Sequence, residues 1–264
     1  MDLQLKNKTA LVTGSTAGIG YAIAKSLATE GATVYINGRD QNKVNSAVQK
    51  LVTETGNSDI KGIAADFSDK QQVENLLTQL PDVDILINNI GIFEPKEFKN
   101  IPDEDWIKFF EVNVLSGVRL ARVYFDKMLA KNWGRIIFIS SESAIQIPAE
   151  MIHYGMTKTA QIAIARGLAE LTTGTNVTVN TVLPGPTASE GATEFVKTVA
   201  KDLGKTDAEM EKEFFTNMRG TSLIKRFLDP EEIANMVTYI ASPLSSATNG
   251  ATLRTDGGVI KTAF

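Results

Sequence analysis

A tyrosine and a lysine, Tyr154 and Lys158, stand four residues apart in a segment whose pattern predicts a helix. Positions i and i+4 lie on one helical face, so the phenol and the ammonium are expected to project together. A free tyrosine titrates at about 10, and a neighbouring cation lowers the pKa of the phenol by stabilising the phenolate. An acid–base group matched to its working pH adds roughly 10²–10⁴-fold in rate. The pair indicates proton transfer, although an ordinary surface pair has the same spacing.

A serine at the end of a predicted strand supports this interpretation. Ser141 directly follows the strand expected over residues 135–140 and precedes Tyr154 by thirteen residues. Strand ends at this edge of an open parallel sheet face the ligand crevice. A hydroxyl there can hydrogen-bond the substrate oxygen that Tyr154 protonates. The spacing favours Ser141, while Ser140 and Ser143 are neighbouring alternatives.

A glycine-rich turn near the amino terminus has the composition of a phosphate-binding loop. Gly14 permits a tight turn after the first apolar run, Gly18 lets backbone approach a phosphate, and Gly20 lets the next helix pack closely. The start of that helix then presents free N–H groups and a positive dipole end to a pyrophosphate. We expect a dinucleotide to contact the whole turn, which comprises Gly14, Ser15, Thr16, Ala17, Gly18, Ile19 and Gly20.

The end of the second predicted strand bears on which dinucleotide binds. NAD-binding proteins usually place an acidic side chain there, where it binds the ribose hydroxyls. Gly38 occupies this position and Arg39 follows it. Glycine removes the repulsion that a carboxylate would exert on a 2′-phosphate, and arginine offers a planar, permanently charged donor. We predict that NADP(H) is preferred, with NAD(H) possible.

Short apolar runs alternate with helical patterns along the chain. Expected strands cover residues 10–12, 34–36, 60–64, 85–87, 136–139, 177–183 and 251–253. Expected helices cover residues 19–29, 41–55, 71–80, 106–130, 153–171 and 231–241. Most runs are continuously apolar, which is typical of strands covered on both faces. The alternation predicts an α/β fold, namely a doubly wound, parallel, seven-stranded sheet of the Rossmann type with helices on both faces.

We expect one domain over residues 1–264, with a substrate lid at about 187–219. This irregular segment follows a strand and holds two short amphipathic patterns, one around Phe195 and one around Phe214. An insertion at a strand's carboxyl end lies over the ligand crevice of such a sheet. The aromatic side chains there, with Phe93, suggest an apolar or bulky substrate, or alternatively subunit packing.

Composition excludes several classes of function. The chain has a net charge of −4 and no cysteine, so disulfides, thiolate metal sites and a cysteine nucleophile are excluded. An acidic balance gives no global attraction for nucleic acid or anionic lipid. Residues 1–8 are polar, and no apolar run approaches the ~20 residues of a membrane span. We expect a cytoplasmic protein with no metal, no nucleic-acid partner and no membrane partner.

These motifs together resemble the short-chain dehydrogenase/reductase family, in its branch of about 250 residues, and its 3-oxoacyl-acyl-carrier-protein reductases most. The likeness runs from Lys6 to Gly258. Beyond the glycine turn and Arg39, the residues that resemble the family's cofactor contacts are Asp66, Phe67, Asn88, Asn89, Ile90, Tyr154, Lys158, Pro184, Gly185, Thr187 and Ser189. Two of them depart from the family pattern, because Ile90 replaces the usual alanine and Thr187 stands where isoleucine is common.

The resemblance also implies roles for four catalytic residues. Tyr154 would be the general acid in reduction and the general base in oxidation. Lys158 would lower the pKa of Tyr154 and bind the nicotinamide ribose, and Ser141 would orient and polarise the carbonyl. Asn113 would hold a water of the proton relay. The implied activity is hydride transfer between nicotinamide and a small-molecule carbonyl or alcohol, by a homotetramer or homodimer built on helices at 106–130 and 154–171.

Two other functions compete with this one. A dinucleotide-binding regulator without turnover would use the same fold, but a pure binder has no need of all four catalytic residues. A Rossmann-type methyltransferase is disfavoured by the Tyr154–Lys158 pair and by Arg39.

Other polar residues receive structural interpretations. His153, the only histidine, is expected to border the pocket or to pack rather than to serve a catalytic triad. Glu142 and Glu150 could contact a polar substrate, but we take them as solvated loop charges. The pair at residues 225–226 could attract an acidic substrate or the cofactor phosphate.

Overall fold

The computed structural model describes residues 1–189 and 205–263 of the chain. Seven strands form one parallel sheet in the order β3-β2-β1-β4-β5-β6-β7, which confirms the predicted fold class. The strands are β1 (Thr9–Val12), β2 (Thr33–Gly38), β3 (Ile60–Ala64), β4 (Ile85–Asn88), β5 (Gly134–Ile139), β6 (Val177–Pro184) and β7 (Thr252–Thr255). The chain moves outward from β1 to β3 and then returns to β4, so the order of strands reverses between β1 and β4. Ligands of such sheets bind at this reversal, beyond the carboxyl ends of the strands.

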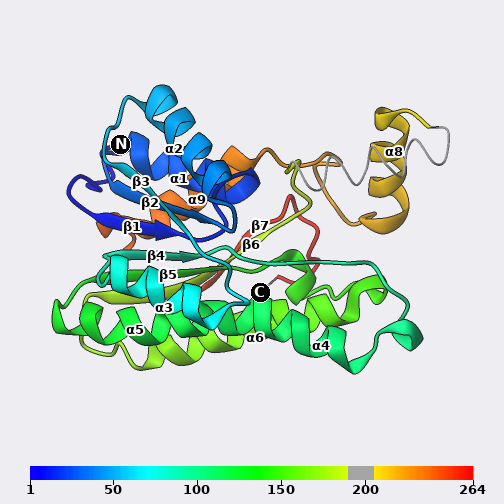
Figure 1. Ribbon diagram of the computed structural model, residues 1–264. Helices are drawn as coiled ribbons and strands as arrows, with labels where there is room; N and C mark the ends of the chain where they lie inside the picture. The colour runs from blue at the N-terminus through cyan, green and yellow to red at the C-terminus, as the bar shows by residue number, and fades with distance from the viewer. Residues whose placement is uncertain (190–204, 264) are drawn as a thin grey trace.

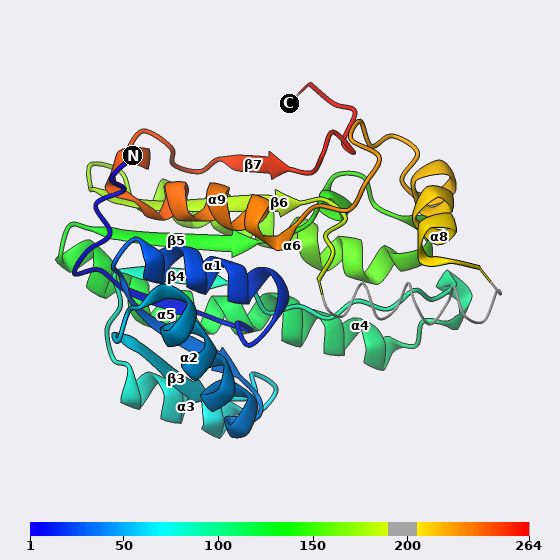
Figure 2. The same ribbon diagram turned by 90° about the horizontal axis from the view of Figure 1, so that it is seen from above.

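Helices cover both faces of the sheet (Figure 1). They are α1 (Gly18–Thr29), α2 (Gln41–Thr55), α3 (Lys70–Gln79), α4 (Asp103–Phe110), α5 (Ser116–Ala130), α6 (Ile152–Glu170), α8 (Asp207–Glu213) and α9 (Pro230–Ala241). Helices α1, α2 and α9 enclose one hydrophobic core, and α3, α5 and α6 enclose the other. Figure 2 shows the arrowheads of β5, β6 and β7 pointing toward the side on which α8 lies.

The burial of the strands follows the sequence pattern. All residues of β4, β5 and β6 are buried, as expected for continuously apolar runs between two helical layers. Strand β7 forms an edge of the sheet, and its residues alternate between exposed and half-buried. It begins and ends later than the predicted run because its backbone pairs with β6 from Thr181 to Pro184.

The helix predicted over residues 106–130 is interrupted. Helix α4 starts at Asp103, where three acidic residues occupy the first turn and favour the positive end of the helix dipole. A π-helical segment, Glu111–Leu115, then separates α4 from α5. Its wider hydrogen bond, from the Ser116 N–H to the Glu111 carbonyl, closes a larger ring than an α-helix does. The segment contains Asn113, and apolar periodicity carries no signal for it.

The described part of the expected lid contains two helical elements. A capping box between Thr206 and Glu209 starts α8, which runs directly into a π-helical segment at Phe214–Met218. The second amphipathic pattern is therefore confirmed, whereas the pattern around Phe195 lies outside the described residues. Within the described ranges, no helix is long and apolar enough to span a bilayer.

Candidate active site

The glycine turn between β1 and α1 has the geometry predicted from its sequence. Gly14 and Gly18 have φ angles of 58° and 57°, in the left-handed region that favours glycine. A Cβ atom added to Gly20 would lie 2.4 Å from the Gly14 carbonyl oxygen, so the third glycine allows the close approach of helix and turn.

The side chains of Ser15 and Asn89 bond to backbone at the turn. Ser15 donates from its hydroxyl to the carbonyl at the end of β1 (2.6 Å) and accepts from the Asn37 N–H (2.9 Å). The Asn89 amide donates to the carbonyls of Thr13 and Gly14, each at 3.0 Å. The side chains of Ser15 and Asn89 therefore build the turn, which leaves their backbone to meet a ligand. Sequence reasoning missed Asn37, whose buried amide also donates to the carbonyls of Ile63 and Ala65 at the end of β3.

The start of α1 fits a dinucleotide phosphate. Its first N–H groups receive no side-chain cap, because Ala17 stands at the capping position. By contrast, the side chains of Asp40 and Asp69 cap α2 and α3. Uncapped N–H groups at a glycine turn form an anion-binding site, so the residues present fit the pyrophosphate of the predicted cofactor.

The end of β2 also fits a 2′-phosphate. A Cβ atom on Gly38 would lie 2.6 Å from the Thr16 methyl carbon, so there is no room for an acidic side chain without movement. The Asp40 carboxylate accepts the Lys43 N–H at 2.8 Å and is engaged as the cap of α2. Arg39 is exposed between them. The carboxylate next to Arg39 in the sequence, that of Asp40, thus already has a hydrogen-bond partner in α2, and Arg39 is exposed to solvent.

The middle of the chain places its predicted cofactor residues in different ways. Asp66 accepts hydrogen bonds from the N–H and hydroxyl of Ser68 and lies near the surface. The side chain of Phe67 is buried in the core enclosed by α3, α5 and α6, so only its backbone can border the cofactor site. Both polar atoms of the buried Asn88 amide lack a partner among the described residues. Ile90 is half-buried and lies against Gly14, which accommodates the extra bulk relative to alanine.

The residues after β6 close the far side of the crevice. A Cβ atom on Gly185 would lie 2.5 Å from the Asp256 carbonyl oxygen, so the glycine lets the two chain segments approach. The Thr187 hydroxyl donates to the Gly185 carbonyl at 2.9 Å. Pro184, Gly185, Thr187 and Ser189 all line the same cavity, of about 630 Å³, as the predicted acid–base residues.

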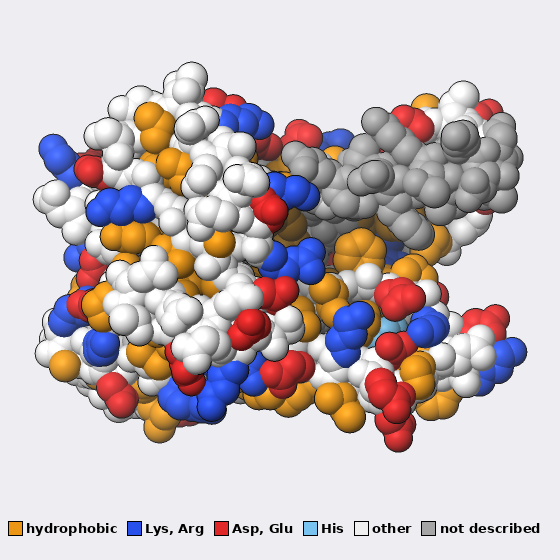
Figure 3. Space-filling view, viewed as in Figure 1, with side chains coloured by type: hydrophobic (Ala, Val, Ile, Leu, Met, Phe, Trp, Pro, Cys, Tyr) orange, Lys and Arg blue, Asp and Glu red, His pale blue; other side chains and the backbone are white. Residues whose placement is uncertain are grey.

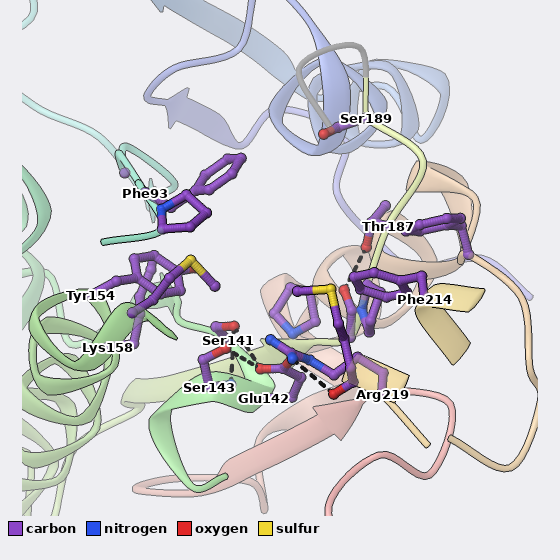
Figure 4. Close-up of a pocket in the computed structure, with 18 of the residues that line it drawn as sticks. Phe93, Ser141, Glu142, Ser143, Tyr154, Lys158, Thr187, Ser189, Phe214 and Arg219 are labelled. Carbon is purple, nitrogen blue, oxygen red and sulfur yellow. Dashed lines mark hydrogen bonds and ion pairs between the residues drawn. The ribbon is translucent and has the colours of Figure 1, made fainter. Parts of the chain in front are cut away.

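Tyr154, Lys158 and Ser141 meet at this cavity (Figure 4). Helix α6 carries the first two, and the Lys158 ammonium lies 5.7 Å from the centre of the Tyr154 ring. Ser141 follows β5, and its hydroxyl forms a hydrogen bond that favours the ionised form of Tyr154. Ser140 is turned away, because its hydroxyl donates to the Lys158 carbonyl at 2.8 Å. Of the three neighbouring serines, Ser141 has the position that the spacing favoured.

Burial dominates the electrostatics of the tyrosine and the lysine. It raises the pKa of Tyr154 to about 12, and the nearby Glu142 charge adds to this effect. Ser141 and Arg219 oppose the rise without overcoming it. Burial also lowers the pKa of Lys158 to about 7. In the protein alone the pKa of Tyr154 therefore stays above its ordinary value, against the expected direction, because desolvation outweighs the favourable contacts and also removes much of the Lys158 charge at neutral pH.

Asn113 is held tightly by its neighbours. Its amide accepts the Ile92 N–H at 2.7 Å and donates to the Ile92 carbonyl at 2.9 Å. It also donates to the Thr157 hydroxyl on α6 at 3.0 Å. The backbone carbonyl of Asn113 accepts a hydrogen bond from the side-chain amide of Gln161 at 2.5 Å. Sequence reasoning did not single out Gln161, although it stands seven residues after Tyr154 on the same helical face.

A buried ion pair joins the serine segment to the described end of the lid. The Glu142 carboxylate accepts from the Arg219 guanidinium at 2.6 Å and from the hydroxyls of Ser141 (3.2 Å) and Ser143. Both charged side chains are almost inaccessible, with exposures of 5% for Glu142 and 8% for Arg219. Arg219 also reaches Glu150 at 3.3 Å. Glu142 is thus not a solvated loop charge, because its carboxylate is buried and paired with Arg219. The sequence could not show this pairing, since the two residues lie far apart along the chain.

Apolar side chains cover the rest of the cavity. Phe93 approaches the Tyr154 ring edge-on, with centroids 6.3 Å apart. Phe214 and Met218 line the opposite side, while Phe215 is buried behind Phe214. Further apolar lining comes from Pro95, Met151, Met210 and Phe227.

The remaining polar candidates have structural partners. His153 is buried against Phe109 and packs as expected, and burial lowers its pKa. Lys225 donates to the carbonyls of Phe215 and Gly220, and Arg226 pairs with Glu232 on α9. Neither cation lines the cavity. On the face shown in Figure 3, basic side chains are interspersed with acidic ones.

Comparison with known proteins assigns the family. The family model for short chain dehydrogenases matches residues 8–200. The chain belongs to the short-chain dehydrogenases. An uncharacterized oxidoreductase of Bacillus subtilis (strain 168), YvaG, is 52% identical over the full length of both chains. A 3-oxoacyl-[acyl-carrier-protein] reductase of Aquifex aeolicus (strain VF5) is 30% identical, covering 98% of this chain and 100% of the relative.

Solved structures of this family superpose closely. L-sorbose reductase from Gluconobacter frateurii, in complex with NADPH and L-sorbose, matches with a TM-score of 0.92 and 30% identity, covering 99% of this chain and 100% of its own. The actinorhodin polyketide ketoreductase with NADPH matches with a TM-score of 0.87 and 26% identity, covering 97% and 98%. This short-chain dehydrogenase is therefore an oxidoreductase with the family's fold over its whole length.

Proposed function

We propose that this short-chain dehydrogenase transfers a hydride between NADP(H) and the carbon of a small carbonyl compound or alcohol. The proposal rests chiefly on the convergence of Tyr154, Ser141 and Lys158 on one cavity that continues to the glycine turn. Such a cavity holds an acid, a hydroxyl donor and a cation within reach of one substrate oxygen. A regulator that only binds a dinucleotide would not need all three of these groups.

The chain's residues would act on the oxygen of the substrate. When bound, the nicotinamide supplies or accepts the hydride. Tyr154 gives its phenolic proton to the carbonyl oxygen in reduction, and its raised pKa keeps it protonated at neutral pH. Ser141 donates a hydrogen bond to the same oxygen, and Lys158 holds the nicotinamide ribose while the Ile139 carbonyl orients its ammonium at 2.9 Å. Phe93 and Phe214 exclude water from the reacting atoms.

The preference for NADP(H) is assigned to Arg39. The uncapped helix start, the missing acidic side chain at Gly38 and the engaged Asp40 support it. Replacing Gly38 is a poor test, because any Cβ there meets Thr16. In Arg39→Leu, we expect the ratio of kcat/KM with NADPH to that with NADH to fall by roughly tenfold or more, since a charge-assisted contact contributes about 1.5–3 kcal/mol. An unchanged ratio, or a wild-type preference for NADH, would contradict this assignment.

A substrate screen tests the reaction class. L-sorbose is bound by the sorbose reductase, and other relatives are named as 3-oxoacyl-[acyl-carrier-protein] reductases, so ketoses, 3-oxoacyl compounds and simple ketones are the panel. We expect at least one of these carbonyl classes to oxidise NADPH, followed at the nicotinamide absorbance. Tight binding of NADPH without turnover across the panel would contradict the proposal and favour a dinucleotide-binding regulator.

We also propose a homotetramer or homodimer built on α4, α5 and α6. Ile107 and Leu171 are exposed over 68% and 64% of their surface, and Phe110 lies near Ile107 on the same short helix. Apolar side chains exposed in this way are typical of subunit interfaces. Light scattering in solution measures the mass, and a monomer at micromolar concentration would contradict the assembly.

A further inference from the structure

One face of α6 presents four polar side chains to the acid–base group. Tyr154, Thr157, Lys158 and Gln161 occupy positions i, i+3, i+4 and i+7, which lie along one side of a helix. Tyr154 and Lys158 line the cavity, whereas Thr157 does not. The Thr157 hydroxyl accepts a hydrogen bond from the Asn113 side-chain amide. Gln161 is the one member of this face without an assigned role.

The Gln161 amide bridges two groups of the acid–base site. Its nitrogen donates to the Asn113 carbonyl at 2.5 Å, and its oxygen accepts from the Lys158 ammonium at 3.4 Å. The side chain is buried, with 2% of its surface exposed. The amide nitrogen thus joins α6 to the π-helical segment, and the amide oxygen contacts Lys158 on α6 itself.

The contact with Asn113 links α6 to the π-helical segment. Its acceptor is the backbone carbonyl of Asn113, and both residues are buried. Removing the partner of a buried polar group costs about 1–3 kcal/mol. Gln161 therefore holds the segment from the neighbouring helix, and its other end contacts the lysine.

We propose that Gln161 is a positioning residue that ties the Lys158 ammonium to the Asn113 carbonyl through its own side chain. The inference rests on the proposed function, in which Lys158 holds the ribose beside Tyr154. The Ile139 carbonyl and the Gln161 oxygen occupy two of the three N–H directions of the ammonium. The third N–H is thereby left for the cavity.

Two substitutions of different size separate bridging from packing. Gln161→Leu keeps the volume but removes both polar contacts, and it leaves no room for water. Gln161→Ala removes four side-chain atoms, so a water molecule can enter and contact both the Asn113 carbonyl and Lys158. Because a bridging water is nearly as good as a direct hydrogen bond, we expect the smaller residue to restore function. A packing role predicts the opposite order, because leucine fills the space better than alanine.

The order of the two variants is the deciding result. We expect kcat to fall roughly tenfold or more in Gln161→Leu but no more than about threefold in Gln161→Ala. The Kd for NADPH, followed by tryptophan fluorescence, should rise more in Gln161→Leu than in Gln161→Ala. If alanine is as impaired as leucine or more so by both readouts, the bridge is not the role of Gln161. Should Gln161→Leu fail to fold, Gln161→Met replaces it as the apolar variant of similar length.

A third variant adds a pH readout that a packing role would not change. In Gln161→Glu, a carboxylate within reach of Lys158 favours the charged ammonium, so the limb of the pH–rate profile that reports Lys158 should move upward by about 1 unit or more. The other titratable or charged groups that line the cavity are Tyr154, Glu142, Glu150, Glu213 and Arg219, and all of them are unchanged in the variant. An unmoved limb would overturn the contact.

The matched controls are Gln79→Leu and Gln79→Ala, on the exposed surface of α3, which should leave all readouts unchanged. The experiment also separates this inference from the proposed function. If wild type binds NADPH but reduces no carbonyl, the proposed function fails, and the order of the NADPH Kd values still decides the role of Gln161.

Discussion

The glycine turn and the acid–base group border the same cavity, but they are built differently. At the turn, the side chains of the buried Ser15 and the half-buried Asn89 bond to backbone, and no ionised side chain is buried. On the acid–base side, Glu142, Lys158 and Arg219 are charged or titratable groups with little access to water. The first side is an uncharged scaffold whose hydrogen bonds are internal. The second side keeps charges in a place where solvation no longer stabilises them.

This difference has a consequence for stability. Changes to the turn should weaken the fold and dinucleotide binding together, because the same backbone serves both. Changes to the acid–base side should separate stability from activity, because buried charges cost stability while they support chemistry.

The largest effect on stability should come from the buried ion pair. Arg219→Ala leaves the Glu142 carboxylate buried without its guanidinium, and breaking one partner of such a pair costs about 3–5 kcal/mol. The pKa of Tyr154 should rise further, because Arg219 lowers it and Glu142 raises it. Urea unfolding measures the first effect, and the pH–rate profile measures the second.

The exposed pair of Arg226 and Glu232 is the matched control. Arg226→Ala should cost no more than about 1 kcal/mol, because water screens a pair at the surface. Equal losses in the two arginine variants would contradict the importance of burial on the acid–base side.

A smaller loss is expected on the scaffold side. In Gly20→Ala, the new methyl group meets the Gly14 carbonyl oxygen at 2.4 Å, so the turn must shift. We expect a loss of about 1–3 kcal/mol in the free energy of unfolding, together with weaker NADPH binding. Gly167→Ala, on α6 with nothing near its Cβ position, should instead gain up to about 1 kcal/mol and leave NADPH binding unchanged. If Gly20→Ala unfolds like wild type and binds NADPH normally, the turn does not couple the two properties.

The two sides also differ in how much the sequence predicts. The turn is a local feature, so the spacing of Gly14, Gly18 and Gly20 between an apolar run and a helix is sufficient to predict its geometry. The parallel sheet could also be predicted, because each apolar run and each helical pattern is a local signal and their alternation indicates the fold class. Sequence spacing does not report which side chains bond back to backbone, and therefore the internal roles of Ser15 and Asn89 were not predicted.

The acid–base side depends on contacts between distant parts of the chain. Glu142 was taken as solvated because Arg219 follows it by 77 residues, beyond any local pattern. The π-helical segment around Asn113 has no apolar period of its own. The pKa of Tyr154 was predicted in the wrong direction because spacing shows a nearby cation but not the degree of burial.

The smallest expected effect is a gain of stability. Burial lowers the pKa of Lys158 from 10.5 to about 7, so the cost of keeping its ammonium charged is fully present below pH 7. That cost disappears as pH rises from 7 toward 10.5, where the folded protein holds Lys158 neutral and the unfolded chain loses its proton. Lys158→Met should therefore raise Tm by about 2 °C or more at pH 6, with a smaller gain at pH 9. A Tm gain that does not change with pH would show that the charge is not its source.

The central claim is that Tyr154 transfers the proton. It is tested most directly by measuring kcat and the NADPH Kd of Tyr154→Phe beside wild type, with the best carbonyl substrate from the screen. We expect kcat to fall by roughly 10²–10⁴-fold, because the variant lacks only the phenolic hydroxyl, while the Kd for NADPH stays within about twofold. A Tyr154→Phe protein that reduces the carbonyl at the wild-type rate would contradict the account.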